Sequence, residues 1–242
     1  GTSHRKHSST FYVAKFFKDN RYIGLLIKKE IERLNKILIT GKKPITVILG
    51  GSKISTKIDV IDNLIKKVDN IIIGGGMAYT FSKALGGEIG NSMIEKTKIN
   101  LAKNLIDKAK KFKCNLSLPV DSINSISFTN DSETYSSSIS SIKKNFIGMD
   151  IGLKTRLKYD KIILNSKTIL WNGPMGVFEF DKFSKGTEFI IKSVLKATEK
   201  GAYSLIGGGD SIAAIKKYNF KTNLLNISTG GGAMLKFLEG SK

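Results

Sequence analysis

The feature that most constrains the fold is a short β-branched run that ends in glycines and precedes a helical stretch, and this pattern recurs along the chain. The run at Ile45–Leu49 ends at Gly50-Gly51, and the run at Asn70–Ile73 ends at Gly74-Gly75-Gly76. Further runs, each followed by glycines or a proline, lie at 115–118, 168–171, 202–206 and 224–227. Strands that alternate with helices form βαβ units, which pair in parallel. The pattern therefore predicts an α/β fold with a mostly parallel sheet over roughly residues 40–242.

The stretches between these runs carry apolar side chains at about 3.6-residue spacing, which is typical of helices packed on a sheet. We expect helices at 21–39, 53–67, 92–112, 184–199 and 233–238, with further ones after Gly76 and from Asp210. Residues 119–147 are rich in Ser and Asn, and we expect irregular strands and a surface loop there. Residues 1–20 show no clear period.

The glycine turns suggest what the sheet binds. Right-handed crossovers place every strand-to-helix turn at the same edge of a parallel sheet. Glycines there let backbone N–H groups approach a ligand, and each helix N-terminus adds about half a positive charge. A single glycine turn of this kind more often reflects the preference of strand-to-helix turns for glycine than ligand binding. The turns at Gly74–Gly76, Gly207–Gly209 and Gly230–Gly232, together with Gly50-Gly51, predict a phosphate-binding rim.

Several phosphate and covalent chemistries are excluded by the residues present. No window has the P-loop pattern, and the dinucleotide fingerprint fails because its last position is Tyr79, Ile212 or Leu235. The two histidines lie at the extreme N-terminus, so no Ser/His/Asp or Cys/His constellation is available. The remaining residues suit phosphoryl transfer by positioning and electrostatics.

The cysteine count and the hydropathy bear on the compartment. The single cysteine, Cys114, excludes an internal disulfide framework and a Cys-based metal site, so we expect a reducing, cytoplasmic setting. No apolar stretch reaches the ~18 residues of a membrane span, so no membrane partner is expected.

The net charge of +20 raises the alternative of a basic nucleic-acid-binding protein. Of the 40 basic residues, however, only Arg5, Arg21, Arg33 and Arg156 are arginine, the residue that reads bases and phosphates in a bidentate manner. The lysines are spread over every segment. We therefore favour solvated lysine faces over nucleic-acid binding.

Individual side chains near the turns carry two interpretations each. Lys53 and Lys57 lie one helical turn apart in the expected helix, so both can point at the rim. Asp210 at a helix start can be an N-cap or can hold Mg²⁺. Glu179 can accept hydrogen bonds from a ribose or can be a surface carboxylate. The cationic cluster at 4–7 suits an anionic substrate or is a solvated tail.

Six segments together closely resemble the phosphoglycerate kinase family, in the family's order and over nearly the whole chain. They are GTSHRKHSS at 1–9, ILGGSKISTKI at 48–58, GGGMAYTF at 74–81, WNGPMGVFE at 171–179, GGGDS at 207–211 and STGGGA at 228–233. The resemblance implies two Rossmann-like domains around a cleft, joined by a long helix. It also implies a phosphotransferase of glycolysis, which transfers a phosphoryl group reversibly between 1,3-bisphosphoglycerate and Mg-ADP to give 3-phosphoglycerate and ATP.

The resemblance also implies a domain assignment. Residues 1–20 would end the N-terminal substrate domain, 21–39 would form the interdomain helix, and 40–242 would form the nucleotide-binding domain. In that domain a Rossmann-like parallel sheet would carry helices on both faces, and 1–20 would be a remnant of a second α/β domain. We therefore expect an N-terminally truncated, monomeric member of the family. The alternative is a non-catalytic nucleotide-binding fragment.

The family's roles carry over by position. Arg5, Lys53, Gly208 and Gly231 would act in catalysis, and His4, Arg5 and His7 would bind the glycerate substrate. Asp210 would bind Mg²⁺. The nucleotide, ADP or ATP, would be bound by Lys53, Lys57, Gly74, Gly75, Gly148, Met149, Asn172, Pro174, Val177, Glu179, Gly208, Gly209, Asp210 and Ser211.

The chain departs from the family pattern in several places. The family's other glycerate-binding arginines and its C-terminal tail have no counterpart here. Thr56 stands where an Asp normally precedes the second lysine, and Ser52 replaces the usual Ala. Residues 120–146 match poorly. We expect the chain alone to bind Mg-nucleotide but to lack most of the glycerate site and useful turnover.

Overall fold

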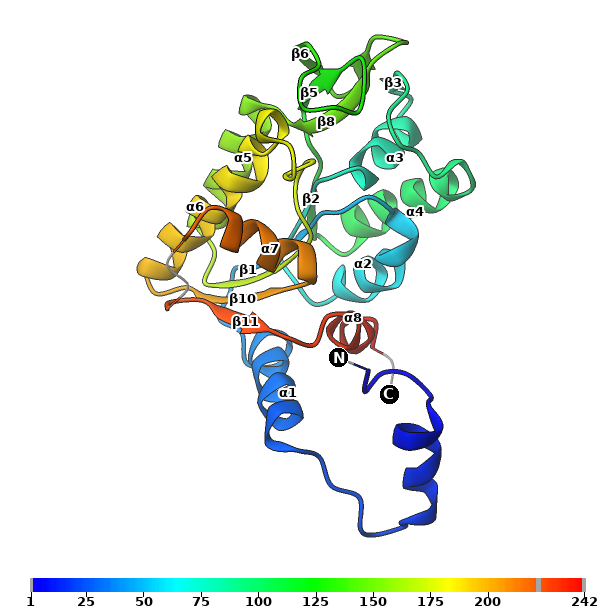
Figure 1. Cartoon of the computed structure of the whole chain (residues 1–242), viewed down its shortest axis with the longest axis vertical. Helices are drawn as coiled ribbons and strands as arrows, with labels where there is room; N and C mark the ends of the chain where they lie inside the picture. Colours follow the sequence, from blue (N-terminus) through cyan, green and yellow to red (C-terminus); the bar gives the residue numbers. More distant parts are fainter. Residues whose placement is uncertain (1, 221–222, 241–242) are drawn as a thin grey trace.

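The computed structural model describes residues 2–220 and 223–240. Its centre is a parallel sheet of six strands in the order β11-β10-β9-β1-β2-β4 (Figure 1). The strands are β1 (Ile45–Leu49), β2 (Asn70–Ile73), β4 (Asn115–Ser117), β9 (Thr168–Asn172), β10 (Tyr203–Gly207) and β11 (Asn226–Ser228). Each lies within about two residues of a run that the sequence predicts to be a strand, so the expected parallel α/β sheet is confirmed.

The strand order reverses once, between β1 and β9. In chain order the six strands are arranged 6-5-4-1-2-3, the doubly wound order of Rossmann-like folds. The register of the β1–β9 ladder pairs Ile45 with Thr168 and Leu49 with Asn172. In such sheets a ligand binds outside the carboxyl ends of the strands at the reversal point. The turns after Leu49 and Asn172 therefore frame the expected site.

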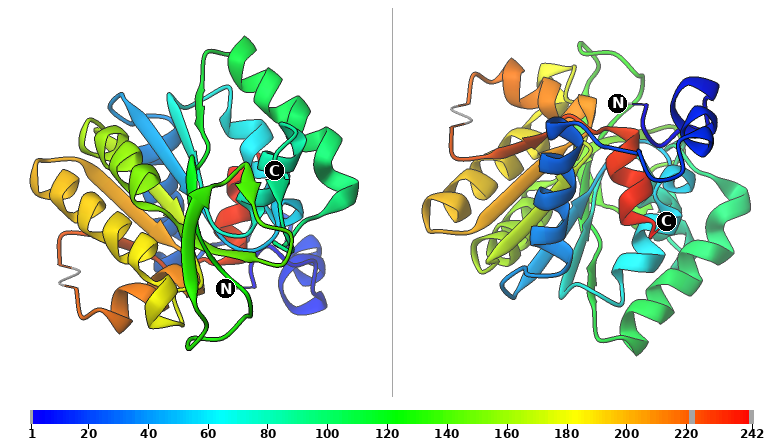
Figure 2. Two further views of the ribbon diagram at one scale, coloured as in Figure 1. Left: turned by 90° about the horizontal axis from the view of Figure 1, so that it is seen from above. Right: turned by 90° about the horizontal axis from the view of Figure 1, so that it is seen from below.

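Helices cover both faces of the sheet, as predicted (Figure 2). One face packs against α1 (Leu25–Leu38), α2 (Ile58–Leu64), α3 (Met77–Ala84), α4 (Ile99–Lys111) and α8 (Gly232–Leu238). The other packs against α5 (Leu153–Leu164), α6 (Lys185–Glu199) and α7 (Gly209–Lys217). Within β1, Val47 and Leu49 belong to the first core and Ile48 to the second, as the period of a strand requires.

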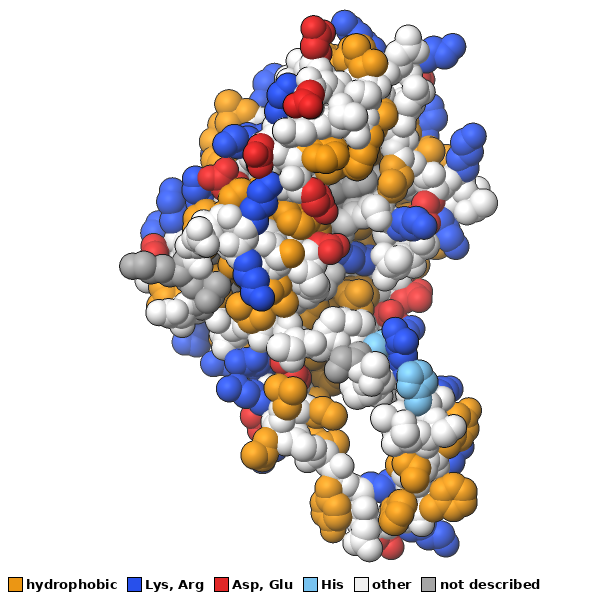
Figure 3. All heavy atoms as spheres, in the orientation of Figure 1, with side chains coloured by type: hydrophobic (Ala, Val, Ile, Leu, Met, Phe, Trp, Pro, Cys, Tyr) orange, Lys and Arg blue, Asp and Glu red, His pale blue; other side chains and the backbone are white. Residues whose placement is uncertain are grey.

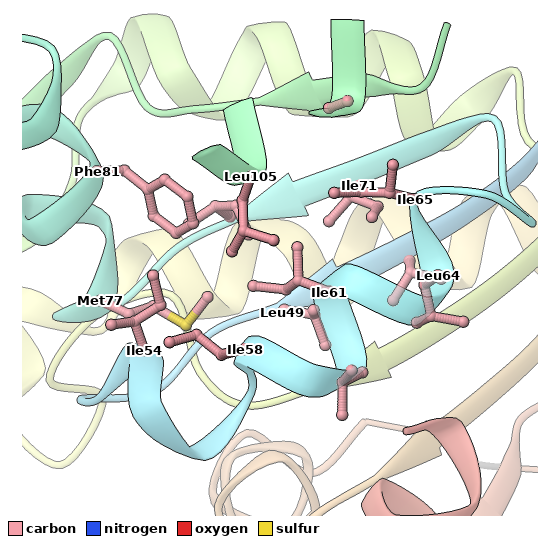
Figure 4. Packing of buried hydrophobic residues seen from close by; sticks show 14 of the residues in the cluster. Leu49, Ile54, Ile58, Ile61, Leu64, Ile65, Ile71, Met77, Phe81 and Leu105 are labelled. Atoms are coloured by element: carbon pink, nitrogen blue, oxygen red, sulfur yellow. The ribbon is translucent and has the colours of Figure 1, made fainter. Parts of the chain in front are cut away.

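The first core shows how the helices are held on the sheet. Ile61 of α2 packs toward Leu49 of β1 and Ile71 of β2, and Phe81 and Leu105 bring α3 and α4 onto the same cluster (Figure 4). All five side chains are buried. This packing holds α2 and α3 on the sheet, and with them the turns that precede them.

Three predicted helices are shorter than expected. The helix expected at 21–39 begins at Leu25, because Gly24 is extended. The helix expected at 53–67 is a 3₁₀ turn, Ile54–Thr56, followed by α2. Its two parts are separated at Lys57, whose backbone leaves the helical region as its side chain enters the interior. The helix expected at 92–112 is a 3₁₀ turn, Lys96–Lys98, followed by α4.

The Ser- and Asn-rich section is more regular than the sequence predicts. Strands β5 (Asp121–Ser125), β6 (Thr134–Ser138) and β8 (Ile147–Ile151) form an antiparallel sheet, with one irregularity between Ile123 and Asn124. β3 (Glu88–Ile89) and β7 (Ser141–Ile142) form a short parallel pair. Side chains of the polar strands bond to one another: buried Asn124 donates to Ser137 Oγ over 2.9 Å.

Residues 8–23 lie beyond the two helical layers, below them in Figure 1, while residues 3–6 lie near α1 and α8. Residues 8–23 contain a π-helical turn, Ser8–Tyr12, and a 3₁₀ turn, Val13–Phe16. Phe16, Tyr22 and Leu25 are 84–86% exposed. The prediction that 1–20 and 21–39 belong to a second domain and an interdomain helix stays a prediction.

Helix α1 is anchored to the end of β11. Glu30 Oε2 accepts a hydrogen bond from Ser228 Oγ over 2.6 Å, and Arg33 donates to the carbonyl of Ile227 over 2.8 Å. These bonds hold the strand end that leads to Gly230–Gly232. Within the described residues, no helix combines the length and apolar character needed to cross a membrane.

Candidate functional site

A cavity of about 200 Å³ lies at the point where the strand order reverses. The turns after β1, β9 and β10 line it, with Gly50–Ser52, Asn172-Gly173 and Gly208–Ser211 at its wall and Thr56 and Lys57 beside them. Three turns far apart in the sequence therefore meet at one edge of the sheet. Of the four glycine turns that the sequence predicts to form one rim, those at Gly50-Gly51 and Gly207–Gly209 meet at this cavity. The turn at Gly74–Gly76 does not line it, and Gly230 lines a different hollow.

Lys57 forms the floor of the cavity. Its ammonium group donates to the backbone carbonyl of Gly50 and, over 2.9 Å, to that of Asn172, so it joins the ends of β1 and β9. The side chain is only 6% exposed. Burial lowers the pKa of Lys57 to about 8, and the negative charge of Asp210 opposes that shift. The amine thus remains mostly charged at neutral pH, with a third N–H to offer a ligand.

Lys53 lies differently from the sequence prediction. The backbone at Lys53 is extended, and a 3₁₀ turn separates it from Lys57. The interpretation that both lysines lie one helical turn apart on one helix is therefore wrong. Lys53 is exposed, whereas Lys57 is buried. Thr56, at the position where the family normally has Asp, donates through Oγ1 to the carbonyl of Lys53 over 2.9 Å and so closes the turn between them.

The turn after β10 supplies backbone donors at a helix start. Gly208 has a φ of +94°, and a Cβ there would lie 2.9 Å from Asn172 Nδ2, so a larger residue does not fit. Buried Ser211 accepts a hydrogen bond from the N–H of Gly173 over 2.7 Å, which ties the turns after β9 and β10 together. Gly209 is exposed beside the cavity.

Asp210 is an exposed side chain in the first turn of α7 and lines the cavity. The helix N-cap is Gly208, without a side-chain capping bond, so the alternative reading of Asp210 as the N-cap is wrong. Within residues 2–220 and 223–240, no three His, Cys, Asp or Glu side chains gather as a metal cage. A single carboxylate at a phosphate rim is nevertheless a usual protein contribution to Mg²⁺ binding, because nucleotide phosphates and water supply the other ligands.

The loop 173–179 connects the cavity to the rest of the predicted nucleotide site. The carbonyl of Pro174 accepts from Gly51 N–H and that of Met175 from Gly75 N–H, each over 2.9 Å. The N–H of Val177 donates to the carbonyl of Met149 over 2.9 Å. A Cβ at Gly50 would overlap the Pro174 carbonyl, so the approach requires glycine. The loop is thus hydrogen-bonded to the turns after β1 and β2 and to β8.

The remaining predicted nucleotide residues surround this loop. Gly74 lies against the Met175 side chain, and Gly148 of β8 lies against the ring of Tyr79, where any Cβ would collide. Met149 is buried. Glu179 is exposed at the loop's end, and its carbonyl accepts from Lys217 Nζ over 3.1 Å. These residues do not line the cavity itself.

The N-terminal cluster lines a different hollow. A space of about 680 Å³ lies between residues 3–6, α1 and α8, and Thr229-Gly230 also lines it. A Cβ at Gly232 would lie 2.9 Å from His4 Nε2, so the half-buried His4 ring packs on the start of α8. The two histidines lie beside basic side chains in Figure 3. Arg5 is exposed at this hollow, whereas His7 does not line it.

The predicted catalytic residues therefore lie at two different hollows. Arg5 lies at the larger hollow, with Gly231 next to Gly230 of its lining, while Gly208 lines the smaller cavity and Lys53 adjoins its lining residue Ser52. Sequence reasoning did not single out Gly173 or Thr187. Gly173 has a φ of +97°, and the Asn-Gly-Pro sequence around it is its only signal. Thr187 Oγ1 accepts a hydrogen bond from the N–H of Met175 over 3.0 Å, a contact that no local sequence pattern predicts.

Comparison with known proteins gives a consistent result. The family model described as phosphoglycerate kinase matches residues 1–241. The chain is 47% identical over 241 residues to the phosphoglycerate kinase of Porphyromonas gingivalis, covering 99% of this chain and 58% of that protein. It is 49% identical over 242 residues to that of Clostridium kluyveri, covering 100% and 60%.

Solved structures agree. Phosphoglycerate kinase from Coxiella burnetii superposes with a TM-score of 0.84 at 41% identity, covering 89% of this chain and 55% of that one. The enzyme from Pyrococcus horikoshii superposes with a TM-score of 0.81 at 30% identity, covering 100% and 60%. The chain thus spans less than two thirds of the length of these relatives. With the family model matched over residues 1–241 and the doubly wound fold shared, this chain belongs to the phosphoglycerate kinase family.

Proposed function

We propose that this chain provides the nucleotide site of a phosphoglycerate kinase, which transfers a phosphoryl group reversibly between 1,3-bisphosphoglycerate and Mg-ADP. The observation that carries the proposal is the meeting of three glycine turns around buried Lys57 where the strand order reverses. Family membership supports the same reaction. The chain spans about 60% of the length of these relatives.

In this proposal the nucleoside lies along the loop 173–179. The adenine would pack between Gly74-Gly75 and Gly148-Met149, with Pro174 and Val177 beside it. The exposed carboxylate of Glu179 would accept hydrogen bonds from the ribose hydroxyls. The contacts of this loop with the turn after β2 and with β8 favour this arrangement.

The phosphates would occupy the 200 Å³ cavity. Backbone N–H groups at Gly208-Gly209 and the start of α7 offer donors and a favourable dipole. Lys57 would use its free N–H on the phosphates, and exposed Lys53 would reach the phosphoryl group in transit. Asn172 and Ser211 would shape the wall. Asp210 would hold Mg²⁺, which neutralises phosphate charge when it is bound.

The proposed transfer needs no general base. The attacking atom is an oxyanion in either direction, so the protein contributes orientation and positive charge. Arg5, with His4 and His7, would hold the glycerate end, and the N–H groups near Gly231 would face the group in transit. The position of His4 on the start of α8 supports placing the glycerate near this turn. For the protein in the cell we propose a cytoplasmic monomer.

Nucleic acid is not part of the proposal. Exposed lysines lie on α4 of one helical layer and on α6 of the other, so they do not form one stripe. Electrostatic binding to a nucleic acid would need such a stripe to follow the phosphate backbone.

Calorimetric titration of Mg-ADP into the purified chain tests the nucleotide half. The proposal predicts saturable binding of one equivalent that weakens in Asp210→Asn. The matched control is Asp59→Asn, which alters an exposed aspartate on α2 away from the cavity lining and should bind like the unaltered chain. A folded chain that shows no binding, or equal weakening in both variants, would contradict the proposal.

A coupled assay of ATP formation from 1,3-bisphosphoglycerate tests the second half. The chain alone should show turnover far below that of a full-length relative, because it spans about 60% of the length of its relatives. Turnover at the level of the full-length enzyme would refute this expectation.

A further inference from the structure

Asp150 is a buried carboxylate that the proposed chemistry does not use. It lies in β8, directly after Met149, and is 1% exposed. Its Oδ2 accepts a hydrogen bond from the N–H of Gly186 over 2.6 Å, and its Oδ1 accepts from the N–H of Ile151 over 2.8 Å. Arg156 of α5 approaches Oδ2 to 3.4 Å. The carboxylate thus joins a strand and two helices.

Two glycines make room for this carboxylate. A Cβ at Gly176 or at Gly186 would overlap Asp150 Oδ1. Neither glycine has a positive φ, so space and not backbone conformation requires glycine at these positions. Gly176 belongs to the loop 173–179, and Gly186 belongs to the first turn of α6. Asp150 therefore lies directly against both segments.

Strand β8 and the first turn of α6 also hold the loop through the residues on either side of Gly176. Thr187, next to Gly186, accepts the N–H of Met175 over 3.0 Å. Met149, next to Asp150, accepts the N–H of Val177 over 2.9 Å. Three successive loop residues are thus held by the β8–α6 contact. A shift of α6 relative to β8 would move the loop that carries Pro174, Val177 and Glu179.

The start of α6 depends on Asp150 as well. Its N-cap, Ser184, makes no side-chain capping bond, so Asp150 supplies from β8 the acceptor that a capping side chain usually provides. Burial raises the pKa of Asp150 to about 7, although Arg156 and the N–H groups of Gly186 and Ile151 favour the charged form. The charge of Asp150 also acts on Tyr79 of α3 and on Tyr218 after α7.

We propose that Asp150 is a positioning residue for the nucleoside: it fixes the start of α6 against β8, and so holds the loop 173–179 where Pro174, Val177 and Glu179 meet the ligand. This inference rests on the proposed nucleotide site. Asp150 itself does not contact the ligand. It affects binding through the position of Glu179 and the neighbouring loop residues.

A double-mutant cycle on Mg-ADP affinity separates this role from general stabilisation. Asp150→Asn keeps the shape of the side chain but removes its charge and one acceptor, and we expect the Kd for Mg-ADP to rise about tenfold. Glu179→Gln should weaken binding as well. If Asp150 acts through the loop, the double variant should bind within about twofold of the weaker single variant.

The control cycle pairs Asp150→Asn with Lys53→Met. Lys53 lies on the turn after β1 and outside the loop, so here the two effects should multiply, within about twofold. Multiplying effects in both cycles, or an unchanged Kd in Asp150→Asn, would overturn the inference. Absence of Mg-ADP binding by the unaltered chain would instead overturn the proposed function.

A second variant covers the case in which Asp150→Asn does not fold, as judged by circular dichroism. Thr187→Val removes only the acceptor for Met175 N–H, and the same two cycles apply to it. Hydrogen exchange gives an independent readout: the amides of Met175 and Val177 should lose protection in either variant, while that of Ile61 in α2 keeps it. Unchanged protection at Met175 and Val177 would contradict the inference.

Discussion

The ammonium group of Lys57 donates a hydrogen bond to the backbone carbonyl of Asn172 over 2.9 Å, across the point where the strand order of the sheet reverses. Its other acceptor is the carbonyl of Gly50. One side chain therefore links the ends of the paired strands β1 and β9 and places a positive charge at the cavity beside them. Stability and ligand binding should both depend on it.

Lys57→Met should weaken both properties. The substitution removes the Lys57 donor from the carbonyls of Gly50 and Asn172. The Asn172 carbonyl still accepts a hydrogen bond from the N–H of Gly50, but a buried carbonyl left unsatisfied at Gly50 costs about 1–3 kcal/mol of unfolding free energy. Mg-ADP affinity should fall at least tenfold, because a charge-assisted hydrogen bond to phosphate is lost. Urea denaturation and calorimetry measure the two effects. Lys67→Met, at an exposed position that does not line the cavity, is the control and should change neither.

The charge of Lys57 should also give stability and binding opposite pH dependences. Its pKa is about 8 in the folded chain and 10.5 in an ordinary setting. Between these values the unfolded chain holds a proton that the folded chain has released, so the contribution of Lys57 to stability rises with pH in this window. Mg-ADP affinity should fall in the same window as the ammonium charge is lost.

Urea denaturation and calorimetry between pH 7 and 10 measure these two slopes, with Lys57→Met as reference. Relative to Lys57→Met, the unaltered chain should gain stability and lose Mg-ADP affinity as the pH rises. A difference that does not vary with pH would contradict the assignment of the lowered pKa to Lys57.

Asp150 should make the stability of the chain fall as pH rises, the opposite of the effect of Lys57, and at lower pH. Its pKa is about 7 in the folded chain against 3.8 ordinarily. Between these values the folded chain keeps a proton that the unfolded chain loses, so this contribution to stability is present at low pH and is lost as pH rises toward 7. Denaturation midpoints from pH 4 to 8 should show this fall in the unaltered chain and not in Asp150→Asn. Asp59→Asn should retain it.

Gly50→Ala should disrupt the joint between β1 and the loop 173–179. Its Cβ would overlap the carbonyl of Pro174 and would also lie close to that of Gly173. Both obstacles are backbone atoms in the interior, so we expect a loss of about 2 kcal/mol or more of unfolding free energy. Gly24→Ala, where no atom lies within 4 Å, is the matched control for denaturation. Equal stability of the two variants would contradict the packing described here.

The parts of the fold set by local pattern could be predicted from the sequence. β-branched runs such as Ile45–Leu49 bury themselves in a parallel sheet, and its topology alone brings the turns at Gly50 and Gly208 to one edge. Residue spacing could not show that the helix is interrupted at Lys57. That interruption follows from the interior position of its side chain, which depends on carbonyls 7 and 115 residues away.

Contacts between distant segments were beyond prediction for the same reason. Asp150 meets Gly186 across 36 residues, and Thr187 meets Met175 across 12. The serine-rich strand β6 lacks the apolar alternation of a half-buried strand, so its regular pairing with β5 was not expected. His4 was recognised by resemblance, but its packing on the start of α8 emerges only from the three-dimensional arrangement.

A crystal structure of this chain with Mg-ADP tests the central claim most directly. The account predicts phosphate oxygens within hydrogen-bond distance of Lys57 Nζ and the Gly208-Gly209 backbone, Mg²⁺ at Asp210, and the adenosine along the loop 173–179. A nucleotide bound in the larger hollow between α1 and α8, with the Lys57 cavity empty, would contradict it.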